Sequence, residues 1–230
     1  SVAYNFSVIK NKMTELNGVD YIGLSSSELH GRNFDQETSR SAVGQPIGSF
    51  FVYEADGLFQ SDAEIQNYKN DRGELLQPNA KPGDIRFKDL NGDGVINSDD
   101  RDFKGNPLPD CSMGLTLGFN YKNFDVSAFF QGVFGNEVYN LTNYLGEFYN
   151  QAQYNKNSTI LDAWRPDNTD TDIPRVTLDD PNNNIRPSTY YIHNASFVRL
   201  KNLKVGYTLP DKVASKLKLK RTYIYLQGQN

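Results

Sequence analysis

The sequence predicts an all-β protein whose strands form an antiparallel sheet. Five segments alternate apolar and polar residues with a period of two, which indicates strands with two different faces. Tyrosine and phenylalanine occur 14 times each among 230 residues, and aromatic side chains favour strands. Asparagine, aspartate and glycine, the usual residues of turns, are also frequent. These features predict strands joined by long loops.

The five predicted strands lie at the two ends and in the middle of the chain. They cover residues 1–8, 114–121, 124–131, 202–209 and 223–227. In the third, Val126 and Phe130 lie on one face and Asp125 on the other. In each segment one face is apolar, whereas the other is polar or small, so the sheet is expected to have two chemically distinct sides.

The connections between these strands alternate between long and short. Residues 12–111 and 135–195 form two long connections. Lys122 and Asn123 make a tight turn, and residues 210–220 form a compact link that suits a short amphipathic helix. Because antiparallel strands reverse direction at each step, both long connections leave the same end of the sheet. This asymmetry is typical of transmembrane antiparallel β-barrels, although a soluble sandwich is the alternative.

The long connections carry patterns of ordered structure. Ser61 and Glu64 have the spacing of a capping box, which predicts a short helix that ends near Tyr68. Residues 47–53 predict an additional strand, and residues 135–149 predict a partly helical segment. The loops are therefore expected to fold.

Composition excludes several classes of protein. No apolar run approaches the ~20 residues that a spanning helix needs, which excludes a helical membrane protein. The formal charge of -4 argues against nucleic acid as a partner. The lone Cys111 cannot form an internal disulfide, and two histidines offer little for a zinc site. The chain also begins and ends inside alternating segments, which we interpret as a piece of a longer protein.

Residues 89–100 have the spacing of an EF-hand-type calcium loop, D-x-N-x-D-G-x-I-N-x-x-D. The candidate metal ligands are Asp89, Asn91, Asp93, the carbonyl of Val95, Asn97 and Asp100. Gly94 permits the sharp turn at the sixth position. The alternative is a turn whose side chains satisfy its own backbone and bind no ion. Either role is structural, because no histidine or activated water ligand accompanies the loop.

Aromatic residues in the second long connection are candidates for ligand binding. Stacking platforms for a sugar or a peptide are predicted from Trp164, Tyr144, Tyr149, Tyr190 and Tyr191. The alternative is that these rings pack the loop onto itself. Carboxylates such as Glu54 and Glu64, or Glu137 and Glu147, match a glycosidase pair only in residue type, so no enzyme is predicted.

Short segments along almost the whole chain match, in the same order, the segments of one protein family. They are Val43–Phe50, Asp56–Gln60, Lys81–Asp89 running into the calcium-like loop, Gly105–Pro107 with Pro109, Gly114–Tyr121, Phe124–Gly132, Gly135–Asn136, Ala195–Leu203, Gly206–Pro210 and Gly228–Asn230. In sequence and order they resemble the C-terminal third of the SusC/RagA family of TonB-dependent outer-membrane transporters.

The resemblance implies about five strands of a 22-stranded barrel in the outer membrane of a Gram-negative, Bacteroidetes-like bacterium. Such barrels import glycans (oligosaccharides) or peptides with a SusD-like surface lipoprotein, and TonB supplies the energy through an N-terminal region. That region and the plug domain are not in this sequence. The alternative function is a secreted, calcium-stabilised carbohydrate-binding module.

In the barrel interpretation, residues 12–111 and 135–195 would be extracellular loops, and the apolar strand faces would contact outer-membrane lipid. Arg199 and Lys201 interrupt the apolar face of the fourth strand, so they are expected at the extracellular rim.

Overall fold

The computed structural model describes residues 1–25, 28–29, 32–33, 37–147 and 155–230. Its sheets are antiparallel, which confirms the all-β prediction. Among the described residues, no helix has the length and apolar character needed to cross a membrane. The chain divides into two compact units. Unit 1 comprises Ser1–Lys10, Leu108–Asn136 and Asn194–Asn230, and unit 2 comprises Asn11–Pro107 and Glu137–His193.

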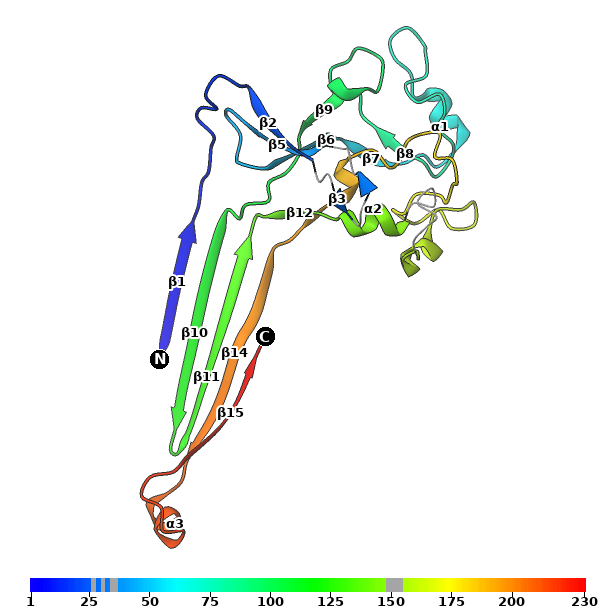
Figure 1. Cartoon of the computed structure of the whole chain (residues 1–230). Helices are drawn as coiled ribbons and strands as arrows, with labels where there is room; N and C mark the ends of the chain where they lie inside the picture. Colours follow the sequence, from blue (N-terminus) through cyan, green and yellow to red (C-terminus); the bar gives the residue numbers. More distant parts are fainter. Residues whose placement is uncertain (26–27, 30–31, 34–36, 148–154) are drawn as a thin grey trace. The chain divides into compact units, whose positions relative to one another are not determined.

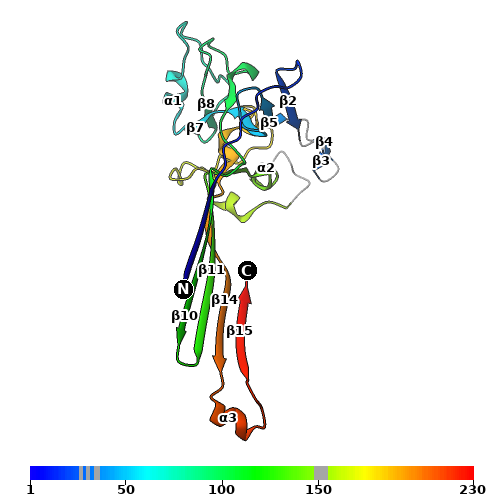
Figure 2. The same cartoon turned by 90° about the vertical axis from the view of Figure 1, so that its left-hand side faces the viewer.

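Unit 1 is a five-stranded sheet in the order β1-β10-β11-β14-β15, drawn as a single layer in Figures 1 and 2. The strands are β1 (Val2–Val8), β10 (Cys111–Tyr121), β11 (Phe124–Phe134), β14 (Phe197–Thr208) and β15 (Tyr223–Gln229). All five predicted strands are present. The three central strands have 11 or 12 residues, as long as the ~9–11 residues that a tilted strand needs to cross a bilayer.

The strand register collects the apolar residues on one face of unit 1. Directly paired residues of antiparallel strands lie on the same face of the sheet. Two adjacent rows on the apolar face read Val2-Leu117-Ala128-Leu203 and Phe119-Val126-Val205-Leu226. A row on the opposite face reads Asn5-Gly114-Gln131-Arg199. The two chemically distinct sides predicted from alternation are therefore present.

A β-bulge interrupts the alternation in β14. Phe129 pairs with Asn202, whereas the next residue, Phe130, pairs with Leu200. Lys201 is the extra residue between these two pairs. An extra residue on one strand shifts the alternation of that strand by one position.

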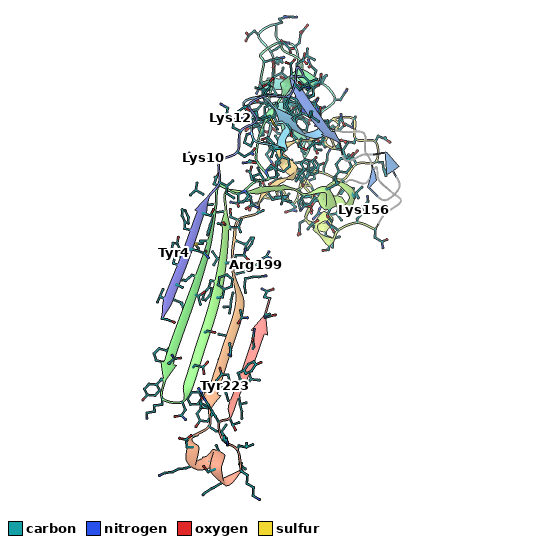
Figure 3. The ribbon with its side chains drawn as sticks, turned by 60° about the vertical axis from the view of Figure 1, so that its left-hand side comes forward. Tyr4, Lys10, Lys12, Lys156, Arg199 and Tyr223 are labelled. Carbon is teal, nitrogen blue, oxygen red and sulfur yellow. The ribbon has the colours of Figure 1, made fainter. Side chains whose placement is uncertain are left out.

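The bulge corrects the expectation for Arg199. This residue pairs with Gln131 and therefore lies on the polar face, so the prediction that it interrupts the apolar face is wrong. Val198 and Leu200 continue the apolar face instead, and Lys201 is absorbed by the bulge. Figure 3 labels Arg199 on β14 and Tyr4, a residue of the apolar face, on β1.

No other element of unit 1, all of whose residues are described, covers the apolar face. The exposed fractions of Phe119 and Leu226 are 65% and 81%, and those of Leu203 and Val205 are 41% each. A water-soluble sandwich would bury these side chains in a core between two layers.

The short connections of unit 1 share one end of the sheet. Lys122, at a positive φ of 54°, and Asn123 form the tight turn between β10 and β11. Asn123 accepts a hydrogen bond from the backbone of Thr208 at the end of β14. The link that follows contains α3 (Asp211–Lys216), as predicted. The pair Val8–Cys111, where the first long connection starts and ends, marks the opposite end.

Unit 2 is formed by the two long connections. Its strands are β2 (Tyr21–Ser25), β3 (Glu28–Leu29), β4 (Arg32–Asn33), β5 (Glu37–Ala42), β6 (Ser49–Tyr53), β7 (Ala55–Leu58), β8 (Ile85–Phe87), β9 (Arg101–Phe103), β12 (Glu137–Tyr139) and β13 (Ile192–Asn194). Its helices are α1 (Asp62–Asn67) and α2 (Leu141–Glu147), with 3-10 turns at Ser98–Asp100, Ser158–Asp162 and Thr189–Tyr191. The largest sheet has the order β2-β5-β6-β9.

The local predictions for unit 2 are confirmed where the structure describes them. The strand expected at 47–53 is β6, and the helical segment expected within 135–149 contains α2. Ser61 caps α1 by accepting the backbone N–H of Glu64. The Glu64 carboxylate accepts the N–H of Gln60 rather than that of Ser61, so the capping box is displaced by one residue.

The core of unit 2 joins both long connections. Leu58, Ile85 and Phe87 from the first connection pack with Tyr144 and Tyr191 from the second. Burial of these large side chains stabilises the contact between the two segments.

Candidate functional site

The calcium-like loop is organised by its two terminal carboxylates. Asp89 accepts the backbone N–H groups of Gly92 and Gly94 at 2.7 and 2.8 Å. Asp100 is fully buried and accepts the N–H groups of Leu90 and Asn97, each at 2.8 Å. The first and twelfth positions of the motif therefore close the loop from both ends.

The middle positions of the motif lie at the surface. Asp93 accepts the N–H of Val95 at 2.9 Å and the side-chain amide of Asn91 at 3.0 Å. The Val95 bond, followed by the Asn91 bond, lowers the pKa of the Asp93 carboxyl. Asn97 accepts the N–H of Asp99 and caps the following 3-10 turn. Asp93 is thus a carboxylate that stays charged and is open to solvent.

Both interpretations of this loop find support in its geometry. Every carboxylate of the motif accepts N–H bonds, as the ion-free alternative requires. Each oxygen of Asp89 accepts one such bond and has a second lone pair, so acceptor capacity for a cation is left there. Among the residues described, no three Asp, Glu, His or Cys side chains converge into a group that could hold a metal ion. Calcium binding by Asp89, Asn91, Asp93, Val95, Asn97 and Asp100 stays a prediction.

Three of the predicted ligand-binding aromatics lie in the core of unit 2. Tyr144, Trp164 and Tyr191 are 6%, 8% and 0% exposed. The Tyr144 and Tyr191 ring centroids are 5.8 Å apart, and the Trp164 indole donates a hydrogen bond to Gln60 at 2.8 Å. Buried ring faces cannot stack on a ligand, which favours the interpretation that these rings pack the loop. Tyr149 lies outside the described residues.

Tyr190 has a different environment from the other aromatics. It lines a hollow of about 200 Å³ together with Gly57, Asp172 and Thr189. Its hydroxyl donates to Glu147 at 2.7 Å, and burial raises the pKa of the Tyr190 hydroxyl. This hollow can receive a small group that combines an apolar face with a hydrogen-bonding edge.

The carboxylates considered for hydrolysis have other partners. Glu54 pairs with Lys88 at 2.5 Å and with Lys104 at 2.7 Å, and these bonds lower the pKa of Glu54. Glu147 accepts the Tyr190 hydroxyl. These carboxylates stabilise the loops through ion pairs and hydrogen bonds.

An arginine and aromatic cluster was not predicted. The Arg40 guanidinium lies 3.7 Å from the Phe51 ring centroid and 4.0 Å from that of Tyr21. Arg101 lies over Phe51 as well, at 5.0 Å. These residues come from β2, β5, β6 and β9, so no sequence spacing could have indicated the cluster before the strand pairing was known.

The chain is similar to known proteins along its entire length. TonB-dependent receptor P3 of Formosa agariphila is 37% identical over 230 residues, which are 100% of this chain and 22% of the receptor. TonB-dependent receptor P26 of the same species is 35% identical over 96% of this chain and 21% of the receptor. TonB-dependent receptor SusC of Bacteroides thetaiotaomicron is 28% identical over 91% of this chain and 18% of the receptor. The chain spans about a fifth of the length of these curated relatives.

Solved structures give the same result for the fold. The structure of the RagAB peptide transporter matches with a TM-score of 0.69 and 25% identity over 100% of this chain and 23% of that chain. The RagAB peptide importer in its open-open state matches with a TM-score of 0.69 and 23% identity, over 100% of this chain and 22% of that chain. No family model matches the sequence. The resemblance to the SusC/RagA family is nevertheless confirmed, because this chain is homologous throughout its length to a part of TonB-dependent receptors.

Proposed function

We propose that this chain forms barrel wall and surface loops of an outer-membrane nutrient importer. The observation that carries the proposal is the sheet of unit 1, a single antiparallel layer with one continuous, uncovered apolar face. An apolar face of this kind is stable against lipid, whereas the polar face suits a water-filled lumen. The related receptors are about five times longer than this chain, so the chain would form one part of the importer.

In this proposal the membrane orientation follows from the connections. Short links at one end of the sheet would face the periplasm, and the long connections that form unit 2 would face the outside. The strand register supports this assignment, because Val8 and Cys111 are paired at the end opposite the Lys122-Asn123 turn.

The cargo would be a glycan or a peptide, delivered with a SusD-like surface lipoprotein and moved with energy from TonB. Relatives named TonB-dependent receptors support the energy source, and the similarity to the RagAB peptide transporter supports the cargo class. Calcium bound at residues 89–100 would stiffen the outer loops without taking part in transport.

A secreted carbohydrate-binding module is disfavoured by the same sheet. A water-soluble module would have to cover Phe119, Val205 and Leu226, which are 65%, 41% and 81% exposed. Within unit 1, whose residues are all described, no second layer of strands or helices covers them.

The proposal is tested by deleting the gene for the full-length protein and measuring growth on a panel of peptides and oligosaccharides as single nutrients. Growth should fail on a narrow set of sources and should return when the gene is restored. Affinity purification of the tagged protein from outer membranes should recover a SusD-like lipoprotein. Unchanged growth on every source, with no lipoprotein recovered, would contradict an importer role.

A further inference from the structure

We propose that unit 2 contains a carboxylate-binding subsite formed by the side chains of Arg101 and Arg186. This proposal deepens the proposed importer function, because it names the chemical group that the loops recognise on the cargo. Two hollows, the charges that line them and the incomplete pairing of the two guanidinium groups support this subsite.

Arg101 and Ser98 belong to two adjacent hollows of unit 2. One, of about 310 Å³, is also lined by Glu37, Tyr53 and Arg186. The other, of about 430 Å³, is also lined by Arg40. Arg101 therefore stands at the boundary between two spaces that can each receive a small ligand.

The carboxylate of Glu37, which lies next to Arg101, is already paired with another arginine. Glu37 receives a bidentate pair from Arg40, with N···O distances of 2.6 and 2.8 Å. The Arg40 bond, the largest influence, lowers the pKa of Glu37. Arg101 reaches the same carboxylate at 3.5 Å and donates to the backbone carbonyl of Glu37 at 3.3 Å, but its buried Nε has no hydrogen-bond partner among the described residues.

Arg186 has no carboxylate within 4.0 Å among the residues that the structure describes. It donates to the backbone carbonyls of Asn183 and Asn182 at 3.1 and 3.0 Å. Its guanidinium lies over the rings of Tyr53 and Phe87, 5.1 and 4.5 Å from their centroids. Burial is the largest influence on this group and lowers the pKa of Arg186.

Nearby carboxylates do not complete the pairing. Asp99 lines the larger hollow beside Arg101. Asp100 is fully buried, and its two oxygens accept backbone N–H groups of its own loop. A partly buried guanidinium without a close counter-ion is costly, and a ligand carboxylate that fits its planar fork removes that cost.

The recognised group is thus a ligand carboxylate with an apolar or ring-like neighbour that can rest on Tyr53. Two sources supply this chemistry, the free C-terminus of a short peptide and the carboxylate of a uronic acid sugar. An uncharged cargo would not offset the charge of Arg101 and Arg186, so neutral analogues are expected to bind more weakly.

The test measures binding to the purified full-length protein in detergent by calorimetry, independently of transport. The probes are trialanine with a free carboxylate, its C-terminal amide, trigalacturonate and neutral galactotriose. One or both of the charged probes should bind at least about tenfold more tightly than their neutral counterparts, because a ligand carboxylate would form charge-assisted hydrogen bonds with the guanidinium groups. Binding of trialanine would identify a peptide C-terminus as the source of the carboxylate, and binding of trigalacturonate would identify a uronic acid.

Variants assign the binding to this subsite. Arg101→Gln and Arg186→Gln should each weaken binding by about tenfold, whereas the exposed Arg165→Gln should bind as the unmutated protein does. Arg101→Lys, which keeps the charge but loses the planar fork, should give an intermediate affinity. Equal binding of charged and neutral probes, no binding of any probe, or full binding by both Gln variants would overturn the subsite. The growth phenotype of the gene deletion would stand in each of these cases, so the two proposals can fail separately.

Discussion

Tyr223 on the polar face of unit 1 depends on the absence of a side chain beside it. Its ring lies over Gly206, where a Cβ would overlap the ring atoms. Its hydroxyl donates to Asp125 at 2.7 Å, and the Lys204 ammonium lies 4.9 Å from the ring centroid (Figure 3 labels Tyr223). Gly206 therefore serves packing, since its φ is not in the left-handed region.

Replacing Gly206 with alanine should displace Tyr223 and destabilise the full-length protein by about 1–3 kcal/mol. Gly228→Ala is the matched control, because no atom lies within 4 Å of the added Cβ. Urea unfolding should separate the two variants. In a Tyr223→Ala background the penalty of Gly206→Ala should disappear, and a penalty that persists there would contradict the packing explanation.

In the calcium-like loop, the prediction concerns Asp93, whose carboxylate is exposed. If calcium binds, Asp93→Ala should lower the melting temperature in calcium and change it much less in EDTA. The reason is that the variant loses a metal ligand, and with it the stabilisation that calcium gives to the folded state. Asp71→Ala, a nearby exposed carboxylate outside the motif, should melt like the unmutated protein. If the unmutated protein melted at the same temperature in calcium and in EDTA, the prediction that this loop binds calcium would be contradicted.

Residue-scale predictions from the sequence depended on whether the decisive contacts are local. The loop at 89–100 could be read from spacing, because Asp89 and Asp100 bond to backbone groups within the same twelve residues. Trp164 could not be assigned, since its burial depends on partners such as Gln60, which is far away in the sequence. Arg101 and Arg186 were missed for the same reason.

At the scale of elements, the alternation of β14 illustrates what a period of two can and cannot reveal. Alternation located all five strands, but it extrapolates a regular strand through Lys201 and so places Arg199 on the wrong face. The bulge becomes visible only when β11 supplies the partners Phe129 and Phe130. Register, unlike strand existence, is a property of two strands together.

Deleting Lys201 should be tolerated, because the extra residue is what the bulge absorbs and both sides of β14 keep their faces. Deleting Lys204 should instead reverse the faces on one side of the deletion. Each apolar side chain that is then moved from the apolar face to the polar face loses about 1.5–3 kcal/mol of favourable burial free energy. The level of folded protein in the outer membrane, measured by heat-dependent gel mobility, should be retained only for the Lys201 deletion, and equal loss in both would contradict the assigned register.

At the scale of the whole molecule, the two long connections form one unit through a buried polar network. Asn184 is fully buried and accepts the backbone N–H of Ile85 at 2.8 Å. It also donates to Asp84 at 2.9 Å, and Asp84 in turn pairs with Arg175 at 2.6 Å. The sequence predicted that the two long connections are ordered, but it did not predict that they pack together as one unit. The contacts that join them link residues about a hundred positions apart.

Asn184→Leu should loosen unit 2, because it leaves the buried Ile85 N–H without a partner, at about 1–3 kcal/mol, and removes one of the two donors to Asp84 Oδ1. Hydrogen exchange should accelerate in β8 and leave the strands of unit 1 unchanged. Asn155→Leu, at an exposed position, is the control. Unchanged exchange at Ile85 would contradict the role of the network.

The importer proposal depends on which face of the sheet contacts lipid, and two neighbouring residues of β10 test it. Leu117 pairs with Val2 and Ala128 on the apolar face, and Thr116 lies on the opposite face. Leu117→Arg should cost about 2–4 kcal/mol if its position is near the bilayer midplane, because the guanidinium would enter hydrocarbon. Thr116→Arg should fold nearly normally, since its side chain would point into a water-filled lumen. Folding of the full-length variants into lipid vesicles at a series of urea concentrations measures both costs. Equal costs for the two variants, or a larger cost for Thr116→Arg, would mean that the apolar face does not contact lipid.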